Sequence, residues 1–338
     1  MATTLPSAAV TRSGDPLEGP GALGEDHGHR DGGHRALVYD DPGAFVAGVG
    51  GFLRDGMRAG DHVAAVLTPE KMGWLRDELG ADADALEYAD ADSFYARHGQ
   101  MLSAMLDLVE GDRAPRSGRV RVVAEQALLR RAPVDVRAYM RYEAAANEVF
   151  GGYDASILCP YDTARLPDEI IEAALRTHPA VVEDGGERRS AAYMDPRAFV
   201  REYVHERGAP PAAPACRIER AGDIAAARER ARAQAIAAGF GEDAVEDFTL
   251  AVSEIATNAL LYGAGPRLVW SYVDGDDLVC QVRDAGSGPA DPLVGYMPPD
   301  EDPSGGRGLW IAHQICDVVE VASRAEHTDV YVHMRLPR

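Results

Sequence analysis

Short apolar runs of strand length alternate with segments of helical spacing from residue 34 to about residue 205. The run at 36–40, for example, is followed by Asp41 and Pro42, which supply a cap and a first-turn proline for a helix that should end at Gly60. Strands that alternate with helices predict an α/β fold with a mostly parallel sheet covered by helices. The expected strands span residues 36–40, 62–68, 86–90, 119–125, 155–160 and 180–184, and the expected helices span 42–57, 94–111, 134–150 and 167–179, with one more that starts at 69.

The order of elements changes after residues 207–216, a proline- and alanine-rich stretch that we interpret as a linker. Two helices, at 223–238 and 243–261, precede two strands joined by a short turn. In the final strand, apolar residues alternate from Val330 to Leu336, which indicates a sheet with one buried face. Helices that precede hairpins predict a two-layer α+β sandwich. The predicted domains are residues 33–206 and 217–338.

Residues 1–32 are rich in Gly, Pro, Ser, Asp and His and lack periodicity, so we interpret them as a flexible tail. His27, His29 and His34 are close together in sequence, and a metal site is conceivable there. No acidic or cysteine ligands join them at a convincing spacing, so a solvated tail is the preferred interpretation.

Composition and charge narrow the functional classes. With 55 acidic and 34 basic side chains the formal net charge is −21, which argues against a general binder of nucleic acids or anionic membranes. We see no run of about 18 apolar residues and no secretory signal, and the four cysteines are far apart, so we expect a cytoplasmic protein with reduced thiols. The one lysine, Lys71, does not lie in a Gly-Lys-Ser/Thr sequence, which excludes a Walker-type phosphate loop.

Two polar residues accompany the apolar stripe of the helix expected over Asp247–Gly263. The stripe consists of Phe248, Val252, Ile255 and Ala259, which recur at helical spacing. Glu254 and Asn258 are four residues apart, so both lie on one face of the helix. This pair is a candidate site, and a polar pair on the surface of an amphipathic helix is the alternative.

Two glycine-rich stretches follow this helix. In RDAGSGP, Asp284 ends a strand, and Gly286 and Gly288 let the backbone turn sharply and approach a ligand. An aspartate in this place can accept a hydrogen bond from an exocyclic amine such as that of adenine. In SGGRGLWIAHQICD, glycines immediately precede an apolar helix at 309–315, whose free amides favour an anion such as a triphosphate. Residues 290–304 hold acidic residues and prolines without periodicity, which predicts a mobile lid.

In this order the three segments resemble the N, G1 and G2 boxes of the GHKL (Bergerat-fold) ATPases over about residues 217–338. The nearest likeness is to the anti-sigma factor serine kinases (RsbW-like), which share the E-x-x-x-N helix and the GRGL sequence. The resemblance implies a Bergerat sandwich, ATP and Mg²⁺ as cofactors, and serine kinase activity. Tyr262 departs from the pattern, because many of these kinases have a histidine there.

The resemblance also assigns roles to single residues. Glu254 would be the general base that takes the proton from a protein serine hydroxyl. Asn258 would ligate Mg²⁺, which needs hard oxygen ligands. Asp284 would bind adenine. The other residues that the resemblance implies are Gly286 and Gly288, which shape the adenine pocket, Gly306, Arg307 and Gly308, which cradle phosphates, and Thr328, which supports adenine.

Residues 34 to about 200 resemble the MEDS domain, a sensory module of bacterial regulators. The likeness is carried by HRALVYDDPGAFVAGVGGFLRDGMRAGDHVAAVLTPE, RVVAEQALLR, RYEAAANEVF and CPYDTARLPDEIIEAALRTHP. Ligands of open parallel sheets gather at the C-terminal ends of strands. The pocket candidates are His34, Tyr39, Cys159, Tyr161 and Asp162. The alternative is that Tyr161 and Asp162 close a turn and that His34 packs beneath the sheet.

Together these resemblances imply a sensor-linked anti-sigma regulator that phosphorylates a serine of an anti-anti-sigma (STAS) protein and so controls a sigma factor. The first domain would sense a small molecule or a partner. The alternative is a catalytically silent, nucleotide-gated module that sequesters a sigma factor or another partner. A self-phosphorylating histidine kinase is disfavoured, because the helix at 223–238 contains no histidine. A homodimer is compatible with the family, and neither nucleic acid nor a membrane is an expected partner.

Overall fold

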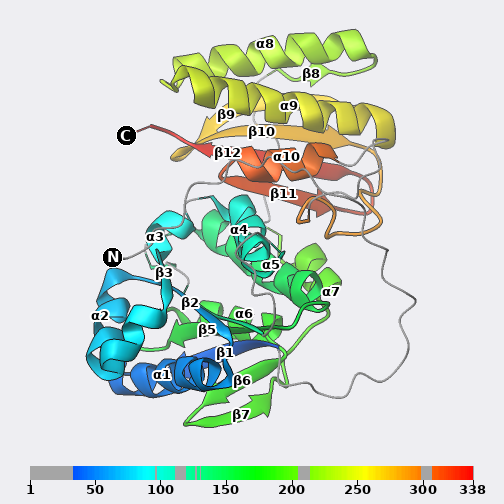
Figure 1. The fold of residues 1–338 in the computed structure, drawn as a ribbon. Helices are drawn as coiled ribbons and strands as arrows, with labels where there is room; N and C mark the ends of the chain where they lie inside the picture. The colour runs from blue at the N-terminus through cyan, green and yellow to red at the C-terminus, as the bar shows by residue number, and fades with distance from the viewer. Residues whose placement is uncertain are drawn as a thin grey trace.

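The computed structural model describes residues 33–95, 97–110, 119–125, 128–129, 131–204, 214–297 and 307–337. These residues form two units, each built on its own sheet, and Figure 1 shows one above the other with helices between the sheets. The predicted tail and most of the predicted linker lie outside the described residues. The tail, the linker and the domain boundaries therefore stay predictions.

The first unit contains a sheet of seven strands among the described residues, in the order β3-β2-β4-β5-β1-β6-β7. Neighbouring strands are parallel except in the hairpin of β6 and β7. This mostly parallel sheet confirms the predicted fold class. The strands are β1 (His34–Tyr39), β2 (His62–Leu67), β3 (Glu87–Asp90), β4 (Val120–Ala124), β5 (Ala155–Asp162), β6 (Ala180–Glu183) and β7 (Gly186–Arg189).

Helices cover both faces of this sheet. The expected cap of α1 is present, because the Asp41 side chain accepts hydrogen bonds from the backbone of Gly43 and Ala44, and the helix ends at Gly60 with a φ of 77°. One apolar core holds α1 and α2 on one face, and another holds α4, α5 and α6 on the opposite face. The helices are α1 (Pro42–Ala59), α2 (Pro69–Leu79), the 3₁₀ turn η1 (Gly80–Ala85), α3 (Ala91–Phe94), α4 (His98–Glu110), α5 (Pro133–Phe150), α6 (Asp168–Thr177) and α7 (Pro196–Glu202).

The sequence pattern did not predict β7 or α7. All four residues of β7 are exposed and none is apolar, so this strand lacks the alternation that marks a half-buried strand. It forms because Asp184 and Gly185, with φ values of 51° and 74°, make a tight turn that returns the chain along β6. Helix α7 has seven residues, too few for a periodic signal, and is anchored by the fully buried Phe199.

The second unit is an antiparallel sheet in the order β11-β12-β10-β9-β8, with three described helices packed on it through a common apolar core. This arrangement confirms the predicted two-layer α+β sandwich. The pattern missed β11, and it assigned Cys216 to the linker although that residue begins β8. The elements are β8 (Cys216–Arg217), α8 (Ala221–Ala237), α9 (Glu242–Tyr262), β9 (Leu268–Asp274), β10 (Asp277–Asp284), α10 (Arg307–Ile315), β11 (Val318–Ser323) and β12 (Thr328–Arg335).

The apolar stripe of α9 is buried as predicted. Phe248 and Val252 are 0% exposed, and the later stripe residues Ile255 and Ala259 are also buried. This packing fixes the rotation of α9 about its axis and thereby the direction of its polar face. Among the helices that the structure describes, α9 included, none is long and apolar enough to cross a membrane.

Helix α5 lies between the two sheets and contacts both units (Figure 1). Arg141, only 1% exposed, donates a hydrogen bond to the carbonyl oxygen of Val319 in β11 at 3.2 Å. The hydroxyl of Tyr142 shares a hydrogen bond with Nδ1 of His313 in α10. Burial, aided by the charge of Arg141, lowers the pKa of His313 to about 3, so this ring is neutral at physiological pH. The two units are therefore docked through buried polar contacts.

Further contacts extend this interface toward α4 and the start of α5. Arg335 of β12 donates two hydrogen bonds to the buried carboxylate of Asp135, at 2.7 and 2.8 Å. Gln314 of α10 donates to the carbonyl oxygen of Gly99 in α4 at 2.9 Å. Because a carboxylate and a guanidinium pair in a specific geometry, this contact favours one relative position of the two units over others.

Gly99→Ala is expected to separate the two units. A Cβ at residue 99 would lie 1.7 Å from the backbone carbonyl oxygen of His313, so α4 and α10 would have to move apart. We expect an increased radius of gyration in small-angle X-ray scattering. Gly73→Ala in α2, where a Cβ meets nothing within 4 Å, is the matched control. An unchanged scattering curve for Gly99→Ala would contradict the docked arrangement.

Candidate nucleotide site and buried sensory cluster

The Glu254–Asn258 pair faces the first turn of α10. Both side chains are partly exposed beside the buried stripe of α9. A Cβ on Gly308 would lie 2.9 Å from Oε2 of Glu254 and 3.0 Å from Nδ2 of Asn258. The lack of a side chain at residue 308 therefore allows both polar groups to reach the start of α10. The structure brings these three predicted site residues together.

Asp284 organises a tight turn at the end of β10. Its Oδ1 accepts hydrogen bonds from the backbone N–H of Gly286 at 2.6 Å and of Ala264 at 3.1 Å. Thr328 is the register partner of Asp284 on β12, and its hydroxyl donates to the carbonyl oxygen of Gly286 at 2.9 Å. Gly288 has a φ of 76°, and a Cβ there would lie 2.0 Å from a side-chain oxygen of β11. The four residues predicted for the adenine pocket thus form one compact group.

This group fits an adenine nucleotide. Since Oδ1 of Asp284 accepts the two backbone bonds, Oδ2 can accept a hydrogen bond from an exocyclic amine. A Cβ on Gly263 would lie 2.6 Å from the carboxyl carbon of Asp284, so glycine keeps this approach open. Arg307 is exposed in the first turn of α10, where its charge and the free amides suit phosphate oxygens. Gly306 lies outside the described residues, and Tyr262 is 67% exposed.

Gly308→Ala is expected to weaken binding of Mg-ATP several-fold with little effect on folding. The new Cβ would push against the ends of the Glu254 and Asn258 side chains, which can move aside but then lose their shared position. Calorimetric titration with Mg-ATP measures the effect. Gly222→Ala in α8, where a Cβ meets nothing within 4 Å, is the control. Equal affinities of the two variants would contradict this placement of the phosphate end.

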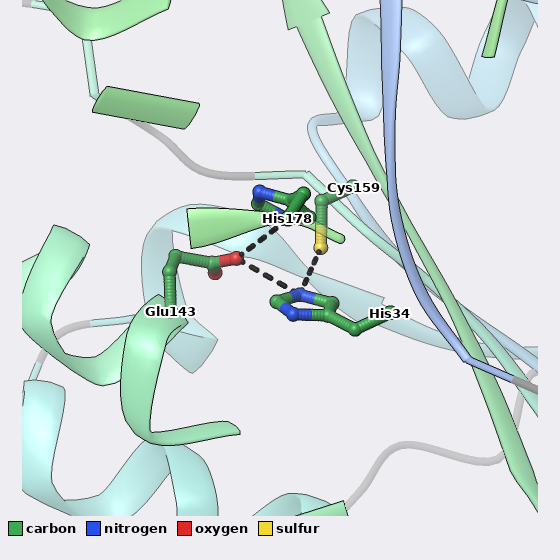
Figure 2. Close-up of side chains that lie close together, drawn as sticks. All are labelled: His34, Glu143, Cys159 and His178. Atoms are coloured by element: carbon green, nitrogen blue, oxygen red, sulfur yellow. Dashed lines mark hydrogen bonds and ion pairs between the residues drawn. The ribbon is translucent and has the colours of Figure 1, made fainter. Parts of the chain in front are cut away.

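A second group of polar side chains is buried beneath α5 on the face of the first sheet (Figure 2). His34 begins β1, Cys159 lies on β5, Glu143 lies on α5, and His178 follows α6. Nε2 of His34 lies 3.1 Å from Oε2 of Glu143 and 3.3 Å from Sγ of Cys159. Nε2 of His178 lies 3.1 Å from the same glutamate oxygen. We call these four residues, none more than 6% exposed, the buried cluster.

Neighbouring groups orient both rings of the buried cluster. Nδ1 of His178 lies 2.8 Å from the carbonyl oxygen of Ala174, and Nδ1 of His34 lies 3.3 Å from Oδ1 of Asn147. Burial alone would raise the pKa of Glu143, but hydrogen bonds and charge from His178 and His34 lower it to about 2. Burial, and then the proximity of His34, lowers the pKa of His178. The Glu143 carboxylate is therefore ionised near pH 7.

The five residues predicted for the sensory pocket do not all lie at one place in the structure. Alternation along β1 places His34 on the α5 face of the sheet and Tyr39 in the core of the opposite face. Cys159 and Tyr161 lie on the same face as His34. Asp162 ends β5, and its Oδ1 accepts a hydrogen bond from a backbone N–H of the following turn at 3.0 Å, which is the turn-closing role of the alternative.

Sequence reasoning missed two members of the buried cluster, Glu143 and His178. Both lie in segments that carry the MEDS resemblance, RYEAAANEVF and RTHP. The sequence signal that could have identified both residues is an ionisable side chain within an apolar segment. Glu143 is followed by three alanines in a helix of the core, and His178 lies two residues before the start of β6. A buried ionisable side chain needs a partner, and these two partner each other.

Tyr39 instead contacts the buried ion pair of Lys71 and Glu125 at the C-terminal edge of the sheet. Nζ of Lys71 lies 5.4 Å from the centre of the Tyr39 ring, and Glu125 also accepts from the backbone N–H of Thr68 at 2.9 Å. Burial, followed by the charge of Asp162, raises the pKa of Tyr39. Lys71, the one lysine of the chain, thus holds the Glu125 carboxylate in place at the C-terminal ends of the strands.

Comparisons with solved structures give only weak likenesses. The RsbU and RsbW domains of Rv1364c from Mycobacterium tuberculosis are 19% identical, with 37% of this chain and 33% of that chain covered and a TM-score of 0.28. The Acinetobacter baumannii histidine kinase AdeS is 16% identical over 28% of this chain and 48% of that chain, with a TM-score of 0.22. The histidine kinase domain of the Erythrobacter litoralis EL346 blue-light activated histidine kinase is 22% identical, with 38% of this chain and 70% of that chain covered and a TM-score of 0.23. The chain spans a third of the first of these structures.

Family comparisons are more informative than these structures. No curated protein matches the chain. Residues 33–179 match the MEDS family, described as the methanogen/methylotroph, DcmR sensory domain. Residues 219–334 match the histidine kinase-like ATPase domain. The first match contains the buried cluster, and the second contains the Glu254–Asn258 pair and the Asp284 turn. The chain therefore carries a MEDS sensory domain followed by a GHKL-type, histidine kinase-like ATPase domain.

Proposed function

We propose that the chain is a sensor-linked anti-sigma regulatory kinase that binds Mg-ATP and phosphorylates a serine of an anti-anti-sigma (STAS) protein. The proposal rests on one main observation, which is that the side chains of Glu254 and Asn258 lie close to Gly308 at the start of α10. A carboxylate, an amide and a helix start at one place suit transfer of a phosphoryl group. The family match supports the nucleotide-binding fold. The serine acceptor and the STAS partner rest on the resemblance in the sequence alone.

The roles of the residues follow from their chemistry. Asp284 and Thr328 would hold adenine, and Asn258 would offer its amide oxygen to Mg²⁺. Bound ATP would supply the phosphoryl group. Glu254 would orient the acceptor hydroxyl and take its proton. In the family logic, phosphorylation of the antagonist releases the kinase to hold a sigma factor.

Contacts between the domains support regulation of the nucleotide site by the sensory domain. The described part of the predicted lid, residues 290–297, lies against the first unit. The ring of Tyr296 lies 4.8 Å from that of Tyr142 on α5, and Asp291 pairs with Arg197 of α7 at 3.3 Å. A cavity of about 280 Å³ between α5 and this segment is lined by Arg141 and by Gly288 of the adenine group. A movement of α5 would therefore reach the adenine end of the site.

A second function is favoured by the same contacts. If the sensory domain holds the lid segment permanently, the ATPase domain would bind nucleotide without turnover. It would then sequester a sigma factor or another partner stoichiometrically. The buried ring packing of Tyr296 between Tyr142 and His313 is the observation that favours this sequestering module.

Labelled ATP separates the two functions. The full chain is incubated with γ-labelled Mg-ATP and each STAS protein of its source genome, and phosphoserine is detected by mass spectrometry. One phosphoserine in a STAS protein would support the kinase. A stable complex without any phosphoprotein at saturating Mg-ATP would favour the sequestering module. Phosphohistidine within the chain itself would overturn both.

A further inference from the structure

The buried cluster has no part in the proposed kinase chemistry. Its four residues come from four separate elements of the first unit, all on one face of the sheet (Figure 2). The burial of two imidazoles, a carboxylate and a thiol at one point is costly unless their polar atoms share a partner. All four ligand-type atoms lie within 4.8 Å of one another.

We propose that His34, Glu143, Cys159 and His178 form a binding site for one divalent transition metal ion of the zinc class. Imidazole nitrogen, thiolate sulfur and carboxylate oxygen are the donors that Zn²⁺ takes in proteins. The mixture of nitrogen and sulfur disfavours Mg²⁺ and Ca²⁺, which take oxygen ligands.

The distances suit a four-coordinate ion. Bonds of about 2.0–2.3 Å to a tetrahedral ion place its ligand atoms roughly 3.3–3.7 Å apart. Nε2 of His34 lies 3.1 Å from Glu143 and 3.3 Å from Cys159, and Nε2 of His178 lies 3.1 Å from Glu143. A small rearrangement, in which these close pairs separate slightly and the wider pairs, which lie within 4.8 Å, approach each other, would therefore admit the ion between the four side chains.

The outer contacts match those that hold metal ligands in place. Metal-bound imidazoles donate their other N–H to a carbonyl or amide oxygen, which fixes the tautomer. Ala174 and Asn147 provide such oxygens to Nδ1 of His178 and of His34. The Tyr139 hydroxyl donates to Oε1 of Glu143 and leaves Oε2 directed at both rings.

Charge balance also favours a divalent ion. An ionised Glu143 and a Cys159 thiolate together carry two negative charges, and two neutral imidazoles add none. A bound M²⁺ makes the buried group neutral, whereas an empty site with both groups ionised would bury uncompensated charge. The thiol proton is released when the metal binds, because only the thiolate is a ligand.

Two tyrosine hydroxyls beside the cluster are a further indication. Tyr95 and Tyr161 are 2% and 0% exposed, and neither hydroxyl has a hydrogen-bond partner among the described residues. The ring centre of Tyr161 lies 5.5 Å from that of His178, and the ring centre of Tyr95 lies 5.6 Å from that of Tyr139, whose hydroxyl donates to Glu143. Buried hydroxyls usually have hydrogen-bond partners, so these two hydroxyls remain available to a polar group bound at the cluster.

The test uses the full chain, purified under reducing conditions without a histidine tag. Mass spectrometric metal analysis should find one zinc ion per chain. After chelation and reconstitution with Co²⁺, we expect the strong visible bands of a tetrahedral site and a thiolate-to-cobalt band in the near ultraviolet. Absence of any metal in the folded chain after supply of both Zn²⁺ and Co²⁺ would overturn the proposal.

Two variants and two controls assign the ligands. Cys159→Ser should abolish the thiolate band, and the isosteric Glu143→Gln should weaken cobalt binding at least tenfold, with circular dichroism confirming that each variant folds. Cys280→Ser, at a buried cysteine of the ATPase domain, should leave both signals unchanged. A chain with both His27 and His29 changed to Gln should also bind one ion. A thiolate band that survives Cys159→Ser would contradict the proposed site.

Discussion

Asp284→Asn is expected to weaken ATP binding by roughly 30-fold or more without unfolding the ATPase domain. The asparagine oxygen can still accept the two backbone hydrogen bonds from Gly286 and Ala264 that the Oδ1 atom accepts now. The other carboxylate oxygen is replaced by an NH₂ group. This NH₂ group and the exocyclic amine of adenine are both hydrogen-bond donors, so no hydrogen bond can form between them. Loss of a hydrogen bond to a charged group, with an unpaired donor left in its place, costs about 2–3 kcal/mol.

Calorimetry with two nucleotides makes this test specific. ITP carries an acceptor oxygen where ATP carries the amine, so Asp284→Asn should lose ATP affinity while its ITP affinity is maintained or improved. Asp276→Asn, at the exposed turn on the other end of β10, is the matched control. Equal losses for both nucleotides would show that the variant damages the turn, and unchanged ATP affinity would remove Asp284 from the adenine site.

Glu254→Gln is expected to lower phosphoryl transfer by about 10²–10⁴-fold, the usual contribution of a general base, with ATP affinity nearly unchanged. Glutamine keeps the size and the helix preference of glutamate, but it cannot accept a proton. The substituted residue lies on the exposed side of the α9 stripe, so the core should be unaffected. Phosphate release from Mg-ATP measures the effect with water as acceptor, and phosphoserine formation measures it with a STAS protein.

Glu246→Gln, an exposed residue two turns earlier on α9, is the control for this second prediction. It should retain full transfer. If Glu254→Gln also retained full transfer while the wild type was active, another residue would be the base. If it lost ATP binding in parallel with transfer, Glu254 would act in binding, and the assignment of a base would be wrong.

Much of the fold could be predicted because periodicity and caps report local structure. Asp41, Pro42 and Gly60 marked both ends of α1, and the apolar stripe of α9 marked its buried face. The exposed strand β7 and the short helix α7 carried no such pattern. They form because of a turn and an anchoring aromatic residue, which act through contacts that periodicity does not record.

The two sites differ in how much the sequence reveals. The nucleotide group is built from short, nearly contiguous motifs, so Asp284, Gly286 and Gly288 could be identified from the sequence as parts of one site. The buried cluster is assembled from four elements far apart in the chain, and strand alternation decides which residues share a face. His34 and Cys159 were found, but Tyr39 was grouped with them although it lies on the opposite face of the sheet.

Helix α5 has a thermodynamic consequence, because it carries a cluster residue and interface residues side by side. Glu143 faces the buried cluster, while Arg141 and Tyr142 contact β11 and α10 of the ATPase domain. A rigid helix cannot move one of these groups without the others. If an occupant of the cluster alters nucleotide affinity through α5, reciprocity requires that nucleotide alter the affinity for that occupant by the same factor. The ATP level of the cell would then set the threshold at which the sensory domain responds.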